Sequence, residues 1–525
     1  MITLSYPIAG GDFDSAGFAT RKLKEQLAKV GVDASALRRA MIAAYEAEMN
    51  VVIHARVGTL WARLDETKLD LEVADEGPGI PDVELAMREG WSTAPDRARQ
   101  MGFGAGLGLP NIRKASDLFQ IETRVGRGTR IRSTILFDGG ARTAAEIAAA
   151  PALLRIEAER CRGCMRCIRA CPAGALRIHN GRPVLLQHLC IGCATCIDEC
   201  ADGVFGLPEN GALRAVPEGA ILIIPRGLVT GFPGFPQPES VVSALRELGF
   251  EKVMFLEEWE EALCAEGRKE AADDTLPLPR IPPLCPPLVA LIESRFPSLI
   301  PHLSPFLSPA ESAGEEFPLR PVFLVAACPG QYSACAESSL TERLTVLAPA
   351  VLAGAVRNLK GLLRPASRSL LGGSSSVVAA RSGELAAGGT RAVMRVLGRA
   401  ETGALGGIDL LDLHFCAGGC SASPLVTREP EIAGLRHAAV PRGAGAGAAG
   451  AVRRTRPYVQ RPGLRLDPDM AQAMRKLALI DSTVGLLPGR DCGSCGAPSC
   501  AALAEDVVVG RAARKACPFI TETER

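Results

Sequence analysis

Eight cysteines of the sequence fall into two runs that share the spacing C-x-x-C-x-x-C-x-x-x-C. The first run is Cys161, Cys164, Cys167 and Cys171, and the second is Cys190, Cys193, Cys196 and Cys200. Three thiolates at this spacing bind three corners of a four-iron, four-sulfur cube, while the fourth cysteine of each run binds the other cube. One predicted cluster is therefore held by Cys161, Cys164, Cys167 and Cys200. The other is held by Cys190, Cys193, Cys196 and Cys171.

Four cysteines near the C-terminus have the number and type of ligands that one more four-iron cluster requires. They are Cys492, Cys495, Cys500 and Cys517. Paired C-x-x-C motifs also bind tetrahedral zinc, so zinc is the alternative metal at both places. Two complete copies of the longer run argue against zinc there, and the shorter C-terminal set leaves it more open.

A carboxylate, a carboxamide and an imidazole are spaced four residues apart in a segment with helical periodicity, about 35–55. They are Glu46, Asn50 and His54, and this spacing places them on one face of a helix. Asn50 can donate its carbonyl oxygen to Mg²⁺. Glu46 can orient or deprotonate an attacking hydroxyl. This face therefore suits a metal–nucleotide site.

Three glycine-containing turns follow this helix. The first comes after a strand-like segment and begins with a carboxylate that can accept a hydrogen bond from an adenine amine. The second opens a helix, where free backbone amides favour phosphate. The third precedes a strand. Each turn is a weak signal alone, but the helix and the three turns in this order predict a nucleotide site. Its residues in the turns are Asp75, Gly77, Gly79, Gly104, Gly106, Gly108 and Thr129.

Six cysteines lie between the double run and the C-terminal set. Four of them are Cys285, Cys328, Cys416 and Cys420. Their spacing alone does not define a metal site, and buried free thiols are the simplest interpretation of it. The remaining two, Cys264 and Cys335, fit no pattern and are expected to be ordinary thiols.

The elements that position these residues form several domains, because 525 residues at roughly 150 per domain give three or four. The patterns predict a multidomain α/β and α+β chain. The N-terminal domain covers 1–140, the double run 155–206, and an α/β region 215–427. A Gly-, Ala-, Arg- and Pro-rich segment, 428–465, is typical of a flexible linker, and the last cysteine block covers 466–525.

Composition narrows the function classes. Lys+Arg (59) nearly balances Asp+Glu (58), and a net charge of +1 gives no electrostatic reason to expect nucleic acid or an anionic membrane as a partner. No apolar run reaches the about 20 residues of a membrane-spanning helix, and the N-terminus lacks a signal-peptide pattern. We therefore expect a cytoplasmic protein. Its 18 cysteines then indicate metal or redox chemistry rather than disulfides.

The double run resembles the bacterial two-cluster ferredoxins. That resemblance implies an electron-relay module with redox partners. The C-terminal cysteine block is similar to the small iron–sulfur domain of carbon monoxide dehydrogenase–corrinoid systems and of membrane electron-transport subunits. Together with the double run it implies three four-iron clusters.

Residues 10–138 resemble the ATPase domain shared by gyrase, Hsp90, histidine kinases and anti-sigma serine kinases. The pattern of Glu46, Asn50 and His54 is most similar to the anti-sigma serine kinases. The resemblance implies an α/β sandwich that binds ATP and Mg²⁺ and phosphorylates a regulatory protein of the anti-anti-sigma type, with Glu46 as the catalytic residue. It is compatible with a homodimer. A nucleotide binder without kinase activity and a degenerate fold that binds no nucleotide are the alternatives.

The loops that carry Cys285, Cys328 and the Cys416–Cys420 pair resemble, in this order, the three signature loops of FeFe-hydrogenase large subunits. This resemblance implies a fourth four-iron cube on Cys285, Cys328, Cys416 and Cys420, with Cys420 bridging to a two-iron subsite. The sequence departs from the family in the shorter length of this region, in the segment 421–424 that replaces a Gly-rich tail, and at three single positions. They are Leu284 in place of a proton-shuttling cysteine, Gln331 in place of a lysine and Ala334 in place of a glutamate. Weak or absent hydrogenase activity is therefore expected.

The whole arrangement is similar to the sensory branch of the FeFe-hydrogenases, which implies an anaerobic organism. The leading hypothesis is a redox or hydrogen sensor whose iron–sulfur centres control an ATP-dependent kinase output. One alternative is a hydrogenase or electron-transfer subunit of a larger redox complex. Another is a non-catalytic redox switch that binds a sigma factor or its antagonist.

Overall fold

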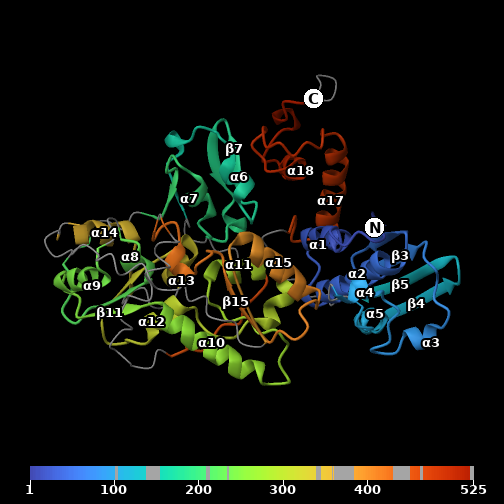
Figure 1. The fold of residues 1–525 in the computed structure, drawn as a ribbon. Helices are drawn as coiled ribbons and strands as arrows, with labels where there is room; N and C mark the ends of the chain where they lie inside the picture. Colours follow the sequence, from blue (N-terminus) through green and yellow to red (C-terminus); the bar gives the residue numbers. More distant parts are fainter. Residues whose placement is uncertain are drawn as a thin grey trace.

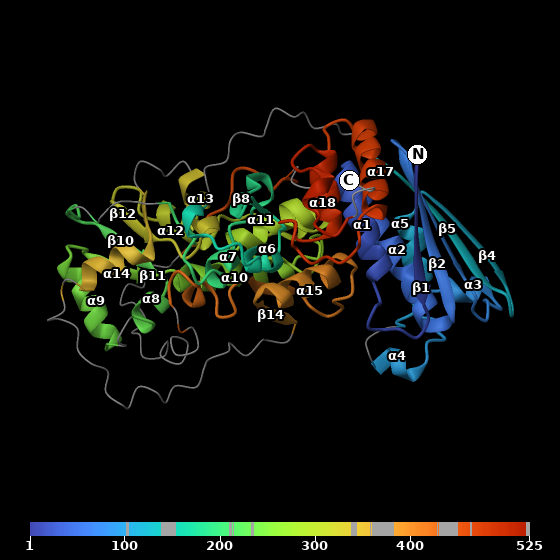
Figure 2. The ribbon, with the colours of Figure 1, turned by 90° about the horizontal axis from the view of Figure 1, so that it is seen from above.

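The computed structural model describes residues 1–520 apart from 101–103, 138–153, 209–212, 214, 233–235, 338–343, 358, 360–382, 428, 430–449 and 462–464. Most of the predicted linker lies outside the described residues. Figure 1 shows an N-terminal domain (1–137) beside a central domain (213–427), with an eight-cysteine module (154–208) next to the central domain. A C-terminal domain (465–520) lies between that module and the N-terminal domain in both views (Figures 1 and 2).

The N-terminal domain is a five-stranded antiparallel sheet in the order β1-β2-β3-β5-β4, with helices packed on one face. Its strands are β1 (Ile2–Ala9), β2 (Val57–Leu64), β3 (Lys68–Asp75), β4 (Leu118–Arg124) and β5 (Gly128–Leu136). Its helices are α1 (Phe18–Val30), α2 (Ala34–His54), α3 (Val83–Ala86), α4 (Asp96–Gln100) and α5 (Gly108–Ala115).

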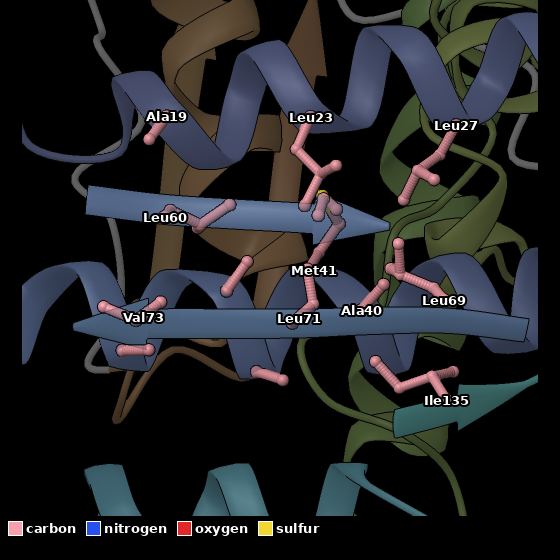
Figure 3. Packing of buried hydrophobic residues seen from close by; sticks show 14 of the residues in the cluster. Ala19, Leu23, Leu27, Ala40, Met41, Leu60, Leu69, Leu71, Val73 and Ile135 are labelled. Atoms are coloured by element: carbon pink, nitrogen blue, oxygen red, sulfur yellow. The ribbon is translucent and has the colours of Figure 1, made fainter. Parts of the chain in front are cut away.

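Alternating apolar residues explain why the helices cover this sheet on one side. Buried and less buried residues alternate along β2 and β3, so one face of each strand is apolar. Figure 3 shows Leu23 and Leu27 of α1 and Met41 of α2 packed with Leu60 of β2 and Leu71 of β3. This core fixes the helix that carries the predicted nucleotide-binding face.

The eight-cysteine module repeats one conformation twice. Each cysteine run leads into a short helix, α6 (Arg166–Ala170) or α7 (Thr195–Glu199). The residue after the second cysteine of each run is left-handed, Met165 at φ 65° and Ala194 at φ 66°. Two small antiparallel pairs complete the module: β6 (Arg155–Ile156) with β9 (Phe205–Gly206), and β7 (Leu176–His179) with β8 (Arg182–Leu185).

The central domain is built on a four-stranded parallel sheet in the order β11-β10-β12-β13. All four residues of β10 and of β12 are buried, as expected for a parallel sheet covered on both faces. The strands are β10 (Ile221–Ile224), β11 (Lys252–Phe255), β12 (Val322–Val325) and β13 (Leu344–Leu347). The helices of this part are α8 (Gly227–Thr230), α9 (Pro238–Glu247), α10 (Glu257–Ala271), α12 (Pro309–Glu315), α13 (Pro329–Glu337) and α14 (Pro349–Arg357).

A second, smaller part of the central domain faces the N-terminal domain. It contains a parallel strand pair, β14 (Glu384–Gly388) and β15 (Leu410–His414). It also contains α11 (Pro286–Arg295), α15 (Thr390–Glu401) and the 3₁₀ helix η4 (Pro297–His302). Helix α2 of the N-terminal domain contacts both η4 and α15.

The segment 450–461 lies against the central domain, which corrects the expectation of a free linker for this part of 428–465. The Leu307 N–H donates to Val452 O over 2.8 Å, and the Arg454 N–H donates to Pro305 O over 2.9 Å. The Arg461 guanidinium pairs with the mostly buried Glu293 carboxylate at 2.7 Å. Backbone hydrogen bonds and this ion pair tie the segment down, whatever its composition.

The C-terminal domain is a helix pair, α17 (Met470–Gly485) and α18 (Cys500–Val508). Ala473, Met474 and Leu477 of α17 belong to the apolar core of the N-terminal domain. The C-terminal domain is therefore continuous with that core. None of the helices in the described part of the chain is long and apolar enough to cross a membrane.

Candidate nucleotide site and iron–sulfur centres

The predicted catalytic glutamate is a residue of helix α2, and its side chain lies close to the start of helix α5. Glu46 Oε1 accepts a hydrogen bond from Asn111 Nδ2 at 2.7 Å. A Cβ atom built on Gly108 would lie 3.3 Å from Asn50 Oδ1 and 3.3 Å from Glu46 Oε2. The two side chains of α2 thus face the first residue of α5, where free backbone amides favour a phosphate. Burial raises the pKa of Glu46, although the hydrogen bond from Asn111 opposes this shift.

Asp75 is held in place by the two turns beside it. Its Oδ1 atom accepts hydrogen bonds from the Gly77 N–H at 2.8 Å and the Thr129 N–H at 3.2 Å. Both of these bonds use Oδ1, so Oδ2 can accept a hydrogen bond from a bound base. Burial raises the pKa of Asp75, and the hydrogen bonds from Gly77 and Thr129, followed by the His54 imidazole, oppose the shift. His54 thus lies beside the Asp75 end of the site, not beside Glu46.

Two glycines of the loop before α5 cannot carry a side chain. Gly104 and Gly106 are left-handed, at φ 81° and 74°. A Cβ atom on Gly106 would lie 2.5 Å from Trp91 O, and one on Gly104 would lie 2.3 Å from Ala94 Cβ. Gly79 is constrained in the same way, because its Cβ would meet Arg124 O at 2.3 Å. These contacts explain the spacing of the glycines on which the sequence prediction depended.

The eight cysteines of the double run line two cavities, and each cavity takes three cysteines from one run and one from the other. The first cavity is lined by Cys161, Cys164, Cys167 and Cys200. The second is lined by Cys171, Cys190, Cys193 and Cys196. These are the two ligand sets predicted from the spacing.

The chemistry of the two cavities fits iron–sulfur clusters. The Gly163 N–H donates to Cys161 Sγ at 3.4 Å, and the Ala175 N–H donates to Cys171 Sγ at 3.3 Å. Burial raises the pKa of the Cys190 thiol to about 12. A buried thiolate is therefore unfavourable without a cation, whereas metal binding deprotonates the ligand thiol. A buried thiol such as Cys190 is therefore stabilised as a thiolate by a bound metal.

Three loops of the central domain bring its four cysteines together. Cys285 precedes α11, Cys328 follows β12, and Cys416 and Cys420 follow β15. Burial raises the pKa of the Cys420 thiol well above its usual range, and Cys285, Cys328 and Cys416 raise it further. The Gln331 N–H donates to Cys328 Sγ at 3.3 Å. The four thiols are thus close enough to interact electrostatically, as the ligands of one four-iron cluster would be, and both this ligand set and the interpretation as free thiols stay predictions.

The neighbourhood of this cysteine set differs from a proton relay. Leu284 is 1% exposed and offers no proton-carrying group. The Gln331 Nε2 atom is buried without a hydrogen-bond partner among the described residues, and Oε1 accepts the Ala327 N–H at 2.6 Å. Cys264 and Cys335 lie in other apolar clusters than Cys285, and Cys420 packs against the cluster that contains Cys335.

The second cavity of the double run touches the central cysteine set. The Gly330 N–H donates to Gly192 O at 3.0 Å. A Cβ on Gly192 would lie 2.4 Å from Gly330 N, so only glycine permits this approach. Burial is the main cause that raises the pKa of the Cys328 thiol, and the nearby Cys285 and Cys193 raise it further. The two cysteine sets are therefore close neighbours.

The C-terminal cysteines gather beside the first cavity. Cys495, Cys500 and Cys517 lie in one apolar cluster. Burial is the main cause that raises the pKa of the Cys495 thiol, and the nearby Cys517 and Cys492 raise it further. The Ile178 N–H donates to Gly496 O at 2.8 Å, and Ile178 lines the first cavity of the double run. The third cysteine set thus lies against the double run.

Replacing Cys285 by serine tests the central set. If the four cysteines hold one four-iron cluster, the variant loses about four irons per chain. Cys264→Ala is the matched control, because this thiol is also buried (9% against 7% for Cys285) but lies outside the set. Elemental analysis of both proteins after anaerobic reconstitution gives the answer. Equal iron in the two variants would contradict the assignment.

Two functional candidates were missed by the sequence analysis. Glu260 of α10 and His414 of β15 lie beside Cys420. The residues come from elements far apart in the chain, so neither helical spacing nor a local motif could have indicated them.

Four family models match consecutive parts of the chain. They describe a histidine kinase-, DNA gyrase B- and HSP90-like ATPase (35–139), a 4Fe-4S dicluster domain (153–201), the C-terminal domain of the iron-only hydrogenase large subunit (229–317) and an Fe-S cluster domain (487–519). The hydrogenase model covers Cys285 and Glu260 but ends before the other three central cysteines. The predicted domain types are confirmed in this order.

Curated relatives match the N-terminal domain. The anti-sigma F factor of Caldanaerobacter subterraneus subsp. tengcongensis is 36% identical over 94 residues, which are 17% of this chain and 62% of that protein. The serine/threonine-protein kinase RsbT of Bacillus subtilis is 31% identical over 120 residues, 22% of this chain and 84% of that protein.

Solved FeFe-hydrogenases match about half of this chain at low identity. A structure that reveals stepwise H-cluster assembly in HydA is 16% identical and has a TM-score of 0.31, covering 51% of this chain and 90% of that chain. A variant of HydA1 from Chlamydomonas reinhardtii is 15% identical with a TM-score of 0.30, over the same shares.

The fold, the positions of Glu46 and Asn50 and the match to RsbT lead to one conclusion. Through its N-terminal domain, this chain belongs to the histidine kinase-, DNA gyrase B- and HSP90-like ATPase family, and that domain is similar to RsbT over most of RsbT's length.

Proposed function

We propose that this protein is an ATP-dependent protein serine kinase whose activity is set by the redox state of its iron–sulfur centres. One observation carries the proposal: two consecutive residues of α18 form ion pairs with the two regions that must communicate, the N-terminal domain and the eight-cysteine module. Glu505 pairs with Lys29 of α1 at 3.1 Å. Asp506 pairs with Arg177 of the eight-cysteine module, with Arg177 Nη2 3.3 Å from Asp506 Oδ1.

The ion pair to the eight-cysteine module is almost completely buried. The side chains of Arg177 and Asp506 are 4% and 1% exposed. Arg511 joins the two acidic residues, at 2.8 Å to Asp506 and 3.3 Å to Glu505. A shift of the eight-cysteine module would therefore be passed through α18 to Lys29 and to the apolar core that α17 shares with α1.

A direct contact between the central and N-terminal domains gives the kinase a second input. Lys24 of α1 forms a buried ion pair with Glu401 of α15, and Ser298 of η4 also donates to Glu401. The Lys24 ammonium lies 3.6 Å from the centroid of the Phe296 ring. Since α15 and η4 also contact α2, movement of the central domain would reach the helix that carries Glu46.

The cysteine sets would hold four-iron clusters, which supply one-electron redox chemistry when bound. The ligand sets are Cys161, Cys164, Cys167 and Cys200; Cys171, Cys190, Cys193 and Cys196; Cys285, Cys328, Cys416 and Cys420; and Cys492, Cys495, Cys500 and Cys517. On the kinase side, Asn50 would bind Mg²⁺, the loop Gly104–Gly108 the ATP phosphates, and Asp75 with Gly77, Gly79 and Thr129 the adenine.

The phospho-acceptor would be a serine of a regulatory protein of the anti-anti-sigma type. Anti-sigma F factor and RsbT, which this domain resembles, support that class of partner. In the proposed reaction the serine hydroxyl oxygen bonds to the γ-phosphorus of ATP, the bond to the β–γ bridging oxygen breaks, and ADP leaves. Glu46 accepts the hydroxyl proton.

The test compares phosphate transfer from ATP to such a protein by the anaerobic full-length chain, once oxidised and once reduced. We expect the two rates to differ. The control is the same pair of measurements on protein from which the clusters have been removed, where the difference should vanish. Equal rates in the oxidised and reduced proteins would overturn the redox part of the proposal, and no transfer in either state would overturn the kinase part.

The pH dependence of phosphate transfer tests the role of Glu46. A general base works only when it is deprotonated, so the rate should be full above its pKa and fall as the pH decreases through it. Burial raises this pKa above that of free glutamate, about 4.3, so the fall should begin at a higher pH than for an exposed carboxylate. Asn111→Leu removes the hydrogen bond that lowers the pKa and should move the midpoint further up. If the midpoint is the same in the Asn111→Leu variant, Glu46 is not the general base.

A further inference from the structure

A carboxylate, an imidazole and a thiol from three separate elements meet beside the central cysteine set. Glu260 lies on α10, His414 ends β15, and Cys420 begins the 3₁₀ helix Cys420–Ala422. One candidate ligand atom from each of the three lies within 4.8 Å of the other two. Figure 1 shows α10 and β15 in the central domain, close to one another, and the two elements are in contact.

One of the two oxygens of the Glu260 carboxylate lacks a hydrogen-bond partner among the described residues. This oxygen, Oε1, is buried. A buried charged oxygen without a partner is costly, so such groups are paired or bind a metal ion. A cation between Glu260, His414 and Cys420 would satisfy this oxygen.

The His414 ring lies between the Asp412 carboxylate and the turn before Cys420, and Asp412 Oδ1 has no hydrogen-bond partner among the described residues. The His414 Nε2 atom lies 3.1 Å from Asp412 Oδ1. The other ring nitrogen, Nδ1, faces the turn before Cys420, since a Cβ atom on Gly419 would lie 3.9 Å from it. Metal-binding histidines commonly donate the second ring N–H to a carboxylate, which fixes the tautomer and leaves the first nitrogen free to bind.

The turn that carries Cys420 is fixed to the helix that carries Glu260. Ser421 Oγ donates to Glu257 Oε1 at 2.5 Å and accepts the Gly227 N–H at 2.7 Å. Glu257 and Glu260 are one helical turn apart on α10, so they lie on the same side of it. Anchoring Ser421 at Glu257 thus positions Cys420 next to Glu260.

We propose that Glu260, His414 and Cys420 bind one divalent first-row transition-metal ion of the Zn²⁺ type. Imidazole, carboxylate and thiolate are its usual ligands, and three protein ligands leave a fourth position for water or a small ligand. The ion would lie where the resemblance to FeFe-hydrogenases places a two-iron unit. This metal site depends on the proposed function in one respect, since Cys420 would also be a ligand of the central four-iron cluster.

The test is equilibrium dialysis of the full-length, cluster-containing protein against Zn²⁺ under anaerobic conditions, followed by elemental analysis and X-ray absorption at the zinc edge. We expect one zinc per chain with one sulfur neighbour and nitrogen or oxygen neighbours. Glu260→Gln and His414→Leu should each weaken zinc retention by about 10-fold or more, with the iron content unchanged. Glu261→Gln, an exposed neighbour on α10, should retain zinc like the unmodified protein.

The iron and zinc measurements separate this proposal from the cluster assignment. Zinc that depends on Glu260 in a chain lacking about four irons would support the metal site and count against the central cluster. Zinc surrounded by sulfur alone, zinc retained equally by Glu260→Gln, or no retained zinc would overturn the metal site. Infrared bands of metal-bound CO and CN⁻ in protein that binds no zinc would overturn it in favour of a two-iron unit.

Discussion

Glu46→Gln is expected to lower the rate of phosphate transfer by about 10²–10⁴-fold, which is the usual contribution of a general base. Glutamine keeps the size of the side chain and can still accept the Asn111 hydrogen bond of 2.7 Å through its carbonyl oxygen. It cannot accept the proton of the attacking hydroxyl. Single-turnover transfer from ATP to a regulatory protein of the anti-anti-sigma type measures the loss.

ATP affinity distinguishes a lost base from a damaged site. Glu46→Gln should bind ATP with nearly unchanged affinity, whereas Asn50→Ala should bind Mg²⁺–ATP less tightly because it removes the proposed metal ligand. The matched control is Glu66→Gln, an exposed glutamate of the same domain. A Glu46→Gln protein that retains the full transfer rate would contradict the assignment of the base.

Asp506→Ala is expected to separate the C-terminal domain from the eight-cysteine module. Arg177 is buried, and the substitution leaves this cation without its carboxylate partner. Breaking one partner of a buried pair typically costs about 3–5 kcal/mol. Backbone carbonyls still accept hydrogen bonds from Arg177, at 2.8 Å for Gly174 O and 3.0 Å for Leu176 O, so the low end of that range is the more reasonable expectation.

Hydrogen exchange at individual backbone amides measures this separation in the full-length protein. A loss of about 3 kcal/mol corresponds to exchange on the order of 10²-fold faster for amides at the interface, including the Ile178 N–H that donates to Gly496 O. The variant should also lose the difference between oxidised and reduced kinase rates. If the difference persists after the interface has opened, α18 is not the connection, and the direct contact through Lys24 and Glu401 would have to carry the signal.

The neighbouring residue provides a matched comparison. Glu505→Ala removes the pair with Lys29, whose side chains are 16% and 18% exposed, so water replaces part of the lost interaction. Its effect on exchange at Ile178 should be much smaller than that of Asp506→Ala. It should instead loosen the contact between α18 and α1. An equal effect of both substitutions at Ile178 would mean that the whole domain has lost its structure.

Local spacing carried most of what could be predicted about the sites. The crossed ligand sets of the double run follow from two adjacent copies of one short motif, because three cysteines within seven residues can only surround one cube. Glu46 and Asn50 were predictable for a similar reason, since residues four apart on a helix must share a face. Gly104 and Gly106 have a left-handed backbone and lie in close contact with residues 90–94. In the sequence, the only sign of these constraints is that both residues are glycine.

The amino-acid sequence by itself therefore determined the domain types, their order and the residues of each local motif. Tertiary structure alone decided how these parts touch. It placed Glu505 and Asp506 between two domains, packed residues 450–461 against the central domain, and brought Glu260, His414 and Cys420 together. The physical reason is that motifs depend on helix and turn geometry over a few residues. Contacts between domains depend on burial and charge pairing between residues that the chain places far apart.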